Sequence, residues 1–305
     1  MFNVWSHRGT YWLSFNVLIL TGCGFTTPQQ VALSTLRQSN PVEVTMSSEG
    51  DVRELHATKL TDGLADQLIH FPLLVKLNVS GSGLTDAGLA KLAGLEKLES
   101  LQLDGTAVTD AGLTHLSTLR QLQHLNLARC PITDAGLKSL AGLTELRTLN
   151  LDTTQITGTG LHHLCSMSKL ETLSLQETPV DFAQCDSLAG LTSLKLLHLA
   201  RTRVDGSIVH VLDGLPSLER LYLDGTNISD ADFPALATAL SEKTPLLKGL
   251  FFDRTQVSDA SLDSLLPLSQ LPDFALIHMT GTKISLDGYI KLRQMLPEVN
   301  LVSTY

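Results

Sequence analysis

Positive charge is scarce in this sequence. Its 305 residues include 22 lysines and arginines against 31 aspartates and glutamates, which gives a formal net charge of −9. A nucleic-acid-binding protein needs a basic face that displaces counterions from phosphates. A protein held on an anionic membrane by its charges needs a polybasic segment. The shortage of lysine and arginine therefore argues against both classes.

The sequence also lacks the short motifs of common catalytic sites. No GxSxG, HExxH or phosphate-loop sequence occurs. Glycine recurs in DGT and TDAG segments, where it suits turns and close helix packing better than nucleotide binding. Aromatic residues make up 5% of the chain, and this scarcity beside abundant leucine is typical of small, repeated cores. We therefore predict no catalytic residue and no cofactor.

What the chain does contain is a repeated unit, best seen in residues 98–120. Leu98, Leu101 and Leu103 form LxxLxL, in which the last two leucines have the period of a short strand. A turn follows, and then Thr109 or Asp110 supplies a helix N-cap, since a short oxygen side chain can accept from the free N–H groups of the first turn. Leucines at three-residue spacing then predict a short helix. One strand and one helix cannot bury their own apolar faces, so the unit needs a copy on each side.

Copies of the unit fill the chain in three aligned columns. The first leucine of the strand returns every 24 residues from Leu74 to Leu218. The column of small polar residues at the turn consists of Thr58, Ser82, Thr106, Cys130, Thr154, Thr178, Thr202, Thr226, Thr255, Thr282 and Thr304. An aliphatic residue follows two positions later in nearly every unit. A helical bundle does not explain this pattern, because the turn residues would break each helix too early.

These columns, LxxLxLxxTxhTDAGLxxLxxL with h for an aliphatic residue, resemble the leucine-rich repeat family over residues 50–305. The pattern looks like the bacterial type common in planctomycete proteins, which is related to the cysteine-containing repeats of F-box adaptors. The resemblance implies an α/β repeat solenoid, a curved horseshoe with parallel strands on its concave face and short helices on its convex face. Threonine mostly stands where the family has asparagine or cysteine. We expect these side chains, with Cys130 among them, to bond neighbouring backbone groups in a ladder along the solenoid.

The first 22 residues are interpreted as an export signal. His7 and Arg8 precede a short apolar run, Leu13 to Leu20, that is too short for a membrane-spanning helix of about 20 residues. The LTGC sequence that ends at Cys23 looks like the lipobox of bacterial lipoproteins. By this resemblance residues 1–22 are removed and Cys23 becomes the lipidated first residue. The alternative is a hydrophobic terminus with a chance cysteine.

The remaining chain divides into a tether, residues 23–41, and a leucine-rich repeat domain, residues 42–305, of about 11 units. Few large apolar residues precede Pro41, and the segment is too short for the helices of an F-box, so the ubiquitin-adaptor function does not carry over. Alternating Val42, Val44 and Met46 predict that residues 42–58 form an N-terminal cap over the first sheet edge. Extra residues in the two units after Thr226 should lengthen the convex side without interrupting the sheet.

The side chain between the two leucines of each LxL should face the concave surface. In chain order these positions are Asn78, Gln102, Asn126, Asn150, Ser174, His198, Tyr222, Phe251 and His278. Amides dominate the first half, and aromatic rings and imidazoles dominate the second. Tyrosine and arginine are frequent binding hot spots. We therefore predict a partner-binding surface formed by His198, Arg201, Arg220, Tyr222, Phe251, Arg254 and His278. The alternatives are a solvated sheet without a partner, or Phe251 packing under the enlarged convex segment.

Other candidate chemistry is thin. His162 and Cys165 lie three residues apart with His163 between them, but structural zinc needs four ligands, so we predict no metal site. Cys185 aligns with Leu161 and replaces a core leucine. A Cys165–Cys185 disulfide would need Cα atoms within about 7 Å, whereas stacked helices usually lie about 8–10 Å apart, so the oxidation state stays open. The aspartates at the strand ends, Asp104, Asp152, Asp224 and Asp253, are interpreted as turn formers.

The sequence thus favours a non-catalytic scaffold, lipid-anchored to a bacterial membrane on its extracytoplasmic side, either in the periplasm or on the cell surface. It would bind a macromolecule on its concave face, most plausibly a protein, with no nucleic acid and no small-molecule cofactor. A rigid, preformed sheet would lose little conformational entropy on binding. Two alternatives stay open: a structural protein of the cell envelope without a specific ligand, and a hydrolytic enzyme that uses concave histidines and aspartates.

Overall fold

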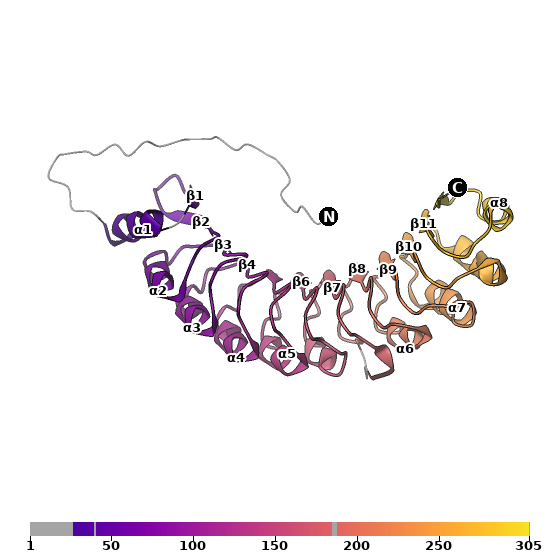
Figure 1. Ribbon diagram of the computed structural model, residues 1–305, viewed down its shortest axis with the longest axis horizontal. Coiled ribbons are helices and arrows are strands. Elements are labelled where there is room, and N and C mark those ends of the chain that lie inside the picture. Colours follow the sequence, from indigo (N-terminus) through magenta and orange to yellow (C-terminus); the bar gives the residue numbers. More distant parts are fainter. Residues whose placement is uncertain (1–26, 40, 185–187, 305) are drawn as a thin grey trace.

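The computed structural model describes residues 27–39, 41–184 and 188–304, which form a curved solenoid (Figure 1). Twelve strands of this part make one sheet, ordered along the chain from β1 to β12. The sheet lines the concave side, and the helices lie along the convex side (Figure 1). The predicted fold class is therefore confirmed.

Most units contribute a strand of three residues. The strands are β1 (Val42–Met46), β2 (Val52–Ala57), β3 (Lys76–Asn78), β4 (Ser100–Gln102), β5 (His124–Asn126), β6 (Thr148–Asn150), β7 (Thr172–Ser174), β8 (Leu196–His198), β9 (Arg220–Tyr222), β10 (Gly249–Phe251), β11 (Leu276–His278) and β12 (Asn300–Val302). From β2 onward they pair in parallel, with equivalent positions opposite one another, as for Leu101 and Leu125. The register places each predicted column on a single line across the sheet.

The convex side consists of short α-helices and 3₁₀ helices, the latter labelled η. The α-helices are α1 (Pro28–Ser39), α2 (Asp62–Ala65), α3 (Asp86–Ala90), α4 (Asp110–Leu113), α5 (Asp134–Leu140), α6 (Val209–Leu212), α7 (Phe233–Lys243) and α8 (Leu286–Met295). The 3₁₀ helices are η1 (Asp66–His70), η2 (Lys91–Gly94), η3 (Thr114–Thr118), η4 (Leu161–Leu164), η5 (Phe182–Gln184), η6 (Gly206–Ile208) and η7 (Asp259–Gln270). No helix in these described ranges is long and apolar enough to cross a membrane.

Leucines from the strands and helices share one continuous core between the two faces. Leu125 and Leu149, from two successive strands, are 1% and 0% exposed. The longer units also follow the prediction, since α7 and η7 pack against each other on the convex side while β9, β10 and β11 stay in parallel register. Removing such leucines from water, together with their copies above and below, is the main stabilisation of the solenoid.

Hydrogen bonds between units come from the aspartate of the TDAG segment. The Asp86 carboxylate accepts from the backbone N–H of Thr109, at 2.7 Å, and from its hydroxyl, at 2.6 Å. The same Thr109 oxygen accepts from Ala111 N at 3.3 Å and so caps α4. Equivalent pairs are Asp62–Thr85, Asp110–Thr133, Asp134–Thr157, Asp230–Ser258 and Asp259–Ser285. Each helix start is thereby tied to the unit before it.

The glycine of TDAG makes room for that aspartate. A Cβ atom built at Gly112 would overlap the carboxylate of Asp86, and one built at Gly136 would overlap that of Asp110. Glycine is therefore required by the approach of a neighbouring side chain. The sequence prediction of close helix packing at this position is confirmed, with the aspartate as the group that comes close.

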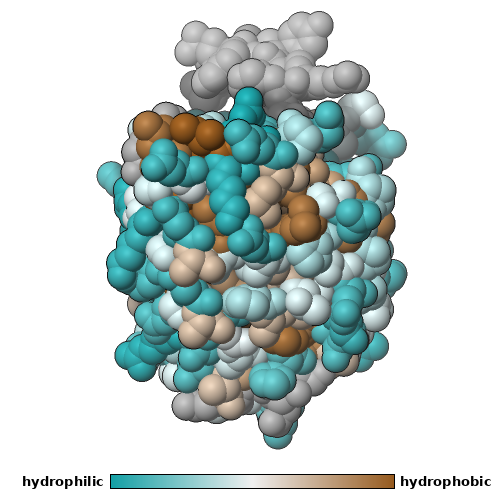
Figure 2. Space-filling view, turned by 90° about the vertical axis from the view of Figure 1, so that its right-hand side faces the viewer, coloured by the Kyte–Doolittle hydropathy of each residue, from teal (hydrophilic) through white to brown (hydrophobic). Residues whose placement is uncertain are grey.

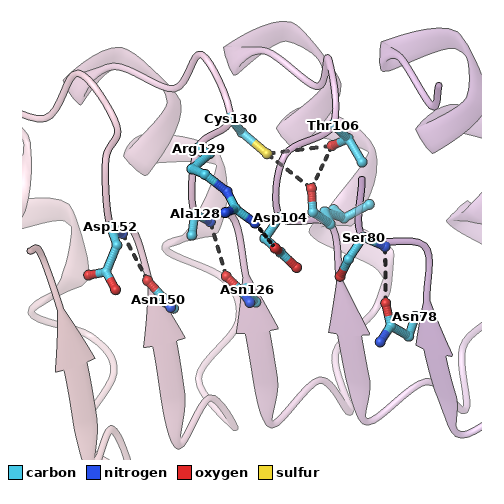
Figure 3. A network of polar contacts seen from close by, with 11 residues as sticks. Asn78, Ser80, Asp104, Thr106, Asn126, Ala128, Arg129, Cys130, Asn150 and Asp152 are labelled. Atoms are coloured by element: carbon cyan, nitrogen blue, oxygen red, sulfur yellow. Dashed lines mark hydrogen bonds and ion pairs between the residues drawn. The ribbon is translucent and has the colours of Figure 1, made fainter. Parts of the chain in front are cut away.

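The threonines of the turn column bond neighbouring backbone groups as predicted, but each bond lies within its own unit and does not connect one unit to the next. Thr106 donates its hydroxyl to the carbonyl of Leu103, at 2.7 Å, within its own unit (Figure 3). Thr154, Thr178, Thr202 and Thr226 make the same short-range bond. Cys130 differs, because its thiol reaches back to the Leu103 carbonyl of the preceding unit, at 3.2 Å. Cys130 also contacts the Thr106 hydroxyl at 3.4 Å, whereas the threonine hydroxyls donate within their own turns.

The N-terminal end is closed by a hairpin and a helix. Strand β1 pairs antiparallel with β2 and forms a hairpin at the first edge of the sheet. The predicted tether is wrong for α1, because Ala32, Leu33 and Leu36 are buried in the common core. These three side chains share one helical face and cover the otherwise open end of the stack. Residues 1–22 and Cys23, with their predicted export and lipidation roles, lie outside the described residues.

The C-terminal end presents a mixed surface. Figure 2 looks onto this end and shows apolar residues set among hydrophilic ones. Leu286 and Ile290, one helical turn apart on α8, are 53% and 46% exposed. The last strand, β12, pairs with β11 through Leu301 and Val302.

Candidate functional site on the concave sheet

The concave amides of the first half hold their own strand ends. The side-chain oxygen of Asn78 accepts from Ser80 N, that of Asn126 from Ala128 N, and that of Asn150 from Asp152 N, at 2.8–3.0 Å (Figure 3). An Asx-type bond of this kind stabilises the bend that follows each strand. The three asparagines of the amide row therefore serve the local structure of their own units.

The concave rings of the second half form a continuous stack across four strands. Tyr222 and Phe251 stack with ring centroids 4.1 Å apart and planes 16° from parallel. Phe251 and His278 stack at 4.8 Å and 28°. His198 closes the other end, edge-on to Tyr222 at 4.8 Å and 75°. We call His198, Tyr222, Phe251 and His278 the ring stack; the structure brings these four predicted residues together.

The sheet itself sets the spacing of the ring stack. Parallel strands lie about 4.8 Å apart, and these four residues occupy equivalent positions on β8 to β11. Rings at adjacent positions therefore meet at stacking distance, where offset pairs contribute about 0.5–1.5 kcal/mol beyond burial. A Cβ atom at Gly249 would lie 3.1 Å from the Phe251 ring. That glycine gives the ring room to lie along its own strand.

Phe251 does not pack under the convex segment. That place belongs to its neighbour Phe252, which is fully buried and meets Phe233 of α7 edge-on at 5.0 Å. Alternation along β10 sends the two phenylalanines to opposite faces of the sheet. The alternative interpretation of Phe251 is therefore wrong, and its ring belongs to the concave surface.

The three predicted arginines lie around the ring stack in two environments. Arg201 and Arg254 occupy the turns after β8 and β10 with positive φ values of 58° and 55°. Arg201 pairs with Glu177 at 2.6 Å. Arg220 is the first residue of β9 and is exposed. Neither Arg220 nor Arg254 forms an ion pair with a carboxylate in the described part of the chain.

His198 joins a polar chain beneath the ring stack. The Ser174 hydroxyl donates to Asp152 at 2.5 Å and contacts Nδ1 of His198 at 3.2 Å. Because the serine proton points to Asp152, Nδ1–H of His198 must be the donor in the second bond. Burial lowers the pKa of His198 despite the opposing charge of Asp152, which favours the neutral imidazole.

This Asp–Ser–His order differs from that of a hydrolytic triad. A nucleophilic serine must give its proton to the histidine, whereas Ser174 gives it to the carboxylate. Ser174 is also only 3% exposed, so a substrate carbonyl could not reach its oxygen. The geometry gives no support to a nucleophile at this position.

Three of the strand-end aspartates, which were predicted to form turns, bind the backbone of the following unit instead of their own turn. Asp152 accepts from Gln176 N, Asp224 from Asp253 N, and Asp253 from Thr280 N, at 2.6–2.9 Å. Burial raises the pKa of Asp224, with backbone hydrogen bonds opposing the shift. Asp104 instead pairs with Arg129 at 2.6 Å (Figure 3). These carboxylates are already engaged by the protein.

The histidine and cysteine positions on the convex side do not gather into a ligand set. His162 and His163 have ring centroids 3.9 Å apart, and Cys165 follows at the end of η4. In the ranges that the structure describes, no three His, Cys, Asp or Glu side chains are placed to hold a metal ion. Cys185 lies outside the described residues, and with it the possible Cys165–Cys185 bridge.

Sequence reasoning missed two supporting residues of the site. It listed Ser174 as a concave residue but did not predict its bonds to Asp152 and His198. It also did not single out Gly249, which stands where the neighbouring strands have Leu196, Arg220 and Leu276. A glycine in a column of large side chains, two residues before a phenylalanine, was the available signal.

Comparisons with known proteins agree with this architecture. Family models described as leucine rich repeat match residues 168–228, 72–93 and 118–141. A leucine-rich repeat protein of Leptospira interrogans has a similar fold, with a TM-score of 0.50 and 16% identity over 77% of this chain and 74% of that one. An internalin of Listeria monocytogenes aligns over 91% of this chain and 94% of its own, at 19% identity and a TM-score of 0.45. No curated protein matches the sequence.

Proposed function

Starting from a leucine-rich repeat solenoid with an open concave sheet, we propose that this chain is a non-catalytic scaffold that binds a protein partner. Leucine-rich repeat proteins generally act as protein-interaction scaffolds, and solenoids use their extended concave surfaces for binding. The proposed binding surface consists of the ring stack with Arg201, Arg220 and Arg254. It occupies the C-terminal half of the concave face.

The ring stack is the observation that carries this proposal. Large rings on the open face of a sheet do not contribute to the buried core, which here is made mostly of leucine. Their edges remain available in the hollow, where aromatic side chains typically provide most of the binding energy of an interface. A sheet that is already ordered loses little entropy on association. The surface therefore has the composition and rigidity of a preformed binding site.

We also propose that the scaffold is a bacterial lipoprotein, anchored through Cys23 on the extracytoplasmic side of a membrane. Support comes from the LTGC sequence after a short apolar run. Several acyl chains on one residue give lasting anchoring, since each buried methylene contributes about 0.8 kcal/mol. Mass spectrometry of the mature N-terminus tests this. A mature chain that retains residues 1–22, or an unmodified Cys23, contradicts it.

The binding proposal is tested by cross-linked capture of partners with the wild-type chain and a Tyr222→Ala, Phe251→Ala variant. We expect the variant to lose the captured partner because two central rings are removed. A Gln102→Ala variant, on the same face but away from the ring stack, is the matched control. If both variants capture the same proteins as the wild type, the chain is better explained as a structural element.

A further inference from the structure

The strongest unexplained feature of the concave face is the environment of Arg220 and Arg254. Most other cations beside the sheet are neutralised by an acid of a neighbouring unit. The pairs are Lys76–Glu54, Arg129–Asp104, Arg147–Glu171, Lys195–Glu171, Arg201–Glu177 and Lys248–Glu219. Within the described residues, Arg220 and Arg254 have no such acid, although both adjoin the ring stack.

The carboxylates closest to them along the chain are already committed. Asp224 accepts from Asp253 N, Asp253 accepts from Thr280 N, and Glu219 pairs with Lys248 at 3.0 Å. These acids serve the turns and the strand starts, and rotating them toward the arginines would leave backbone N–H groups unsatisfied. Arg220 and Arg254 therefore keep no carboxylate partner among the described residues, in a chain whose net charge is −9.

The rings between the two arginines favour the same kind of ligand. Phe251 stacks with Tyr222 and with His278, while Tyr222 stacks with Phe251 and meets His198 in a T-shaped contact. Cations bind aromatic faces, and these faces are occupied. An aromatic ring is negative on its face and positive at its edge. The edges that remain available therefore favour oxygen anions and carbonyl groups.

We propose that this surface binds an acidic segment of a protein partner, with carboxylates at Arg220 and Arg254 and an apolar side chain between them on the ring stack. Arg220 lies opposite Gly249 in the sheet, five positions before Arg254. The chain rises about 10 Å from Gly249 to Phe252 at about 3.3 Å per residue and then turns at Asp253 and Arg254, so the Cα atoms of the two arginines lie on the order of 10–15 Å apart. An extended segment with acidic residues about four positions apart spans that distance. This inference rests on the proposed function and specifies its partner.

A nucleic acid fits the surface less well than an acidic peptide. Its phosphates would extend along the concave face past the Asp152 carboxylate, which pairs with no lysine or arginine in the described part of the chain. A protein segment can confine its carboxylates to the two arginines. The two ligands share negative charge, so the experiment must separate them.

Fluorescence anisotropy with labelled nonapeptides tests the inference on the full chain. The probe peptide carries two glutamates four positions apart around a central leucine, and its matched partner carries glutamine at both positions. We expect the glutamate peptide to bind more tightly, and its affinity to fall with added salt as expected for exposed charges. The Arg220→Gln, Arg254→Gln variant should weaken its binding by about tenfold or more.

Arg129→Gln is the control variant, since Arg129 occupies the same turn position as Arg254, with φ values of 59° and 55°, but is paired with Asp104. It should bind the glutamate peptide as the wild type does. Equal affinity for both peptides, or no effect of the double arginine variant, overturns the acidic partner. If the Tyr222→Ala, Phe251→Ala variant still loses its captured partner in that case, the proposed function is supported although the partner segment is not acidic.

Two further results overturn the inference. The first is that a single-stranded oligonucleotide of equal charge binds as tightly as the glutamate peptide and loses as much affinity in the arginine variant. The ligand would then be a polyanion in general and not a protein segment. The second result is that neither peptide binds measurably and that the Tyr222→Ala, Phe251→Ala variant captures the same partner as the wild type. This result contradicts both the acidic segment and the proposed binding site.

Discussion

The carboxylate of Asp110 holds both the backbone N–H and the hydroxyl of Thr133, 23 residues later, at 2.9 Å and 2.6 Å. The same threonine oxygen accepts from Ala135 N and caps helix α5. One aspartate therefore links the start of its own helix, α4, to the start of the next. This relation repeats along the first half of the solenoid and again near its C-terminal end.

Replacing Asp110 with alanine should lower the free energy of unfolding by about 2 kcal/mol, because hydrogen bonds to charged acceptors each contribute about 1.5–3 kcal/mol and this site is partly exposed. Chemical denaturation measures the loss. Asp66→Ala is the matched control: it removes an ion pair with Lys91 in which both side chains are about half exposed, and it should cost less than about 1 kcal/mol. Equal losses in the two variants would argue against the role of Asp110.

Gly136→Ala should destabilise the chain by about 1–3 kcal/mol, because its new methyl group would overlap the Asp110 carboxylate and crowd Leu113. Gly142→Ala, where nothing lies within 4 Å of the built Cβ, should instead be neutral or stabilising by about 0.4–1 kcal/mol. In an Asp110→Ala background the cost of Gly136→Ala should shrink. An unchanged cost in that background would show that another group sets it.

Thr153→Gly should raise the stability of the chain by about 1 kcal/mol. Thr153 has a φ value of 56°, a left-handed conformation that is costly for a β-branched residue and natural for glycine. The reverse change, Gly81→Thr, places threonine at the equivalent turn, where φ is 66° and the built Cβ meets nothing. It should lose a similar amount in the same denaturation experiment. A stabilising Gly81→Thr would refute the argument from backbone conformation.

Stability should fall as the pH drops from about 7 to 5, with His198 contributing. Burial lowers its pKa in the folded state below the ordinary value of 6.5. Between the two values the unfolded chain binds more protons, so the unfolding free energy decreases as the pH falls through the unfolded-state pKa. His198→Gln should flatten this slope, and His70→Gln serves as the control variant at an exposed position. Denaturation at a series of pH values decides between them; equal slopes in all three chains would exclude His198.

At pH values below this range, protonation of the aspartates that link the units should lower the free energy of unfolding. Burial alone would raise the pKa of Asp134, but hydrogen bonds from Thr157, Gly160 and Gly158 hold it below the ordinary value of 3.8. A depressed carboxyl pKa stabilises the fold above the unfolded-state value, and this contribution is lost as the pH falls toward the folded-state value. The two pH ranges therefore separate the imidazole from the carboxylates.

The strand columns could be predicted from the sequence because the parallel register places equivalent residues of all units on the same side of the sheet. A leucine between two polar positions recurs every 24 residues. The leucine faces the core, and the two polar side chains face the concave surface. The concave positions from Asn78 to His278 were identified in this way, and their register is confirmed. The stacking of Tyr222 on Phe251 then follows from the strand spacing.

The features that were missed depend on side-chain direction between units. A TDAG segment predicts a helix start, but it does not say that its aspartate reaches the threonine of the following unit. The constant 23-residue interval between Asp62 and Thr85, and between Asp110 and Thr133, carried that information. Helix α1 was missed because Ala32, Leu33 and Leu36 form only a narrow apolar face in a polar segment. That face suffices where it has one open end to cover.

The link from each aspartate to the next threonine also bears on how such a chain can change its length. Every junction from Asp62 to Thr157 uses an aspartate and a threonine 23 residues apart, so deleting 24 residues between two of these aspartates would let Asp110 bind Thr157 as it now binds Thr133. Duplication or loss of one such 24-residue unit therefore preserves the aspartate–threonine hydrogen bonds at the new junction. The number of repeat units can therefore differ between related proteins while the ring stack on β8 to β11 is retained.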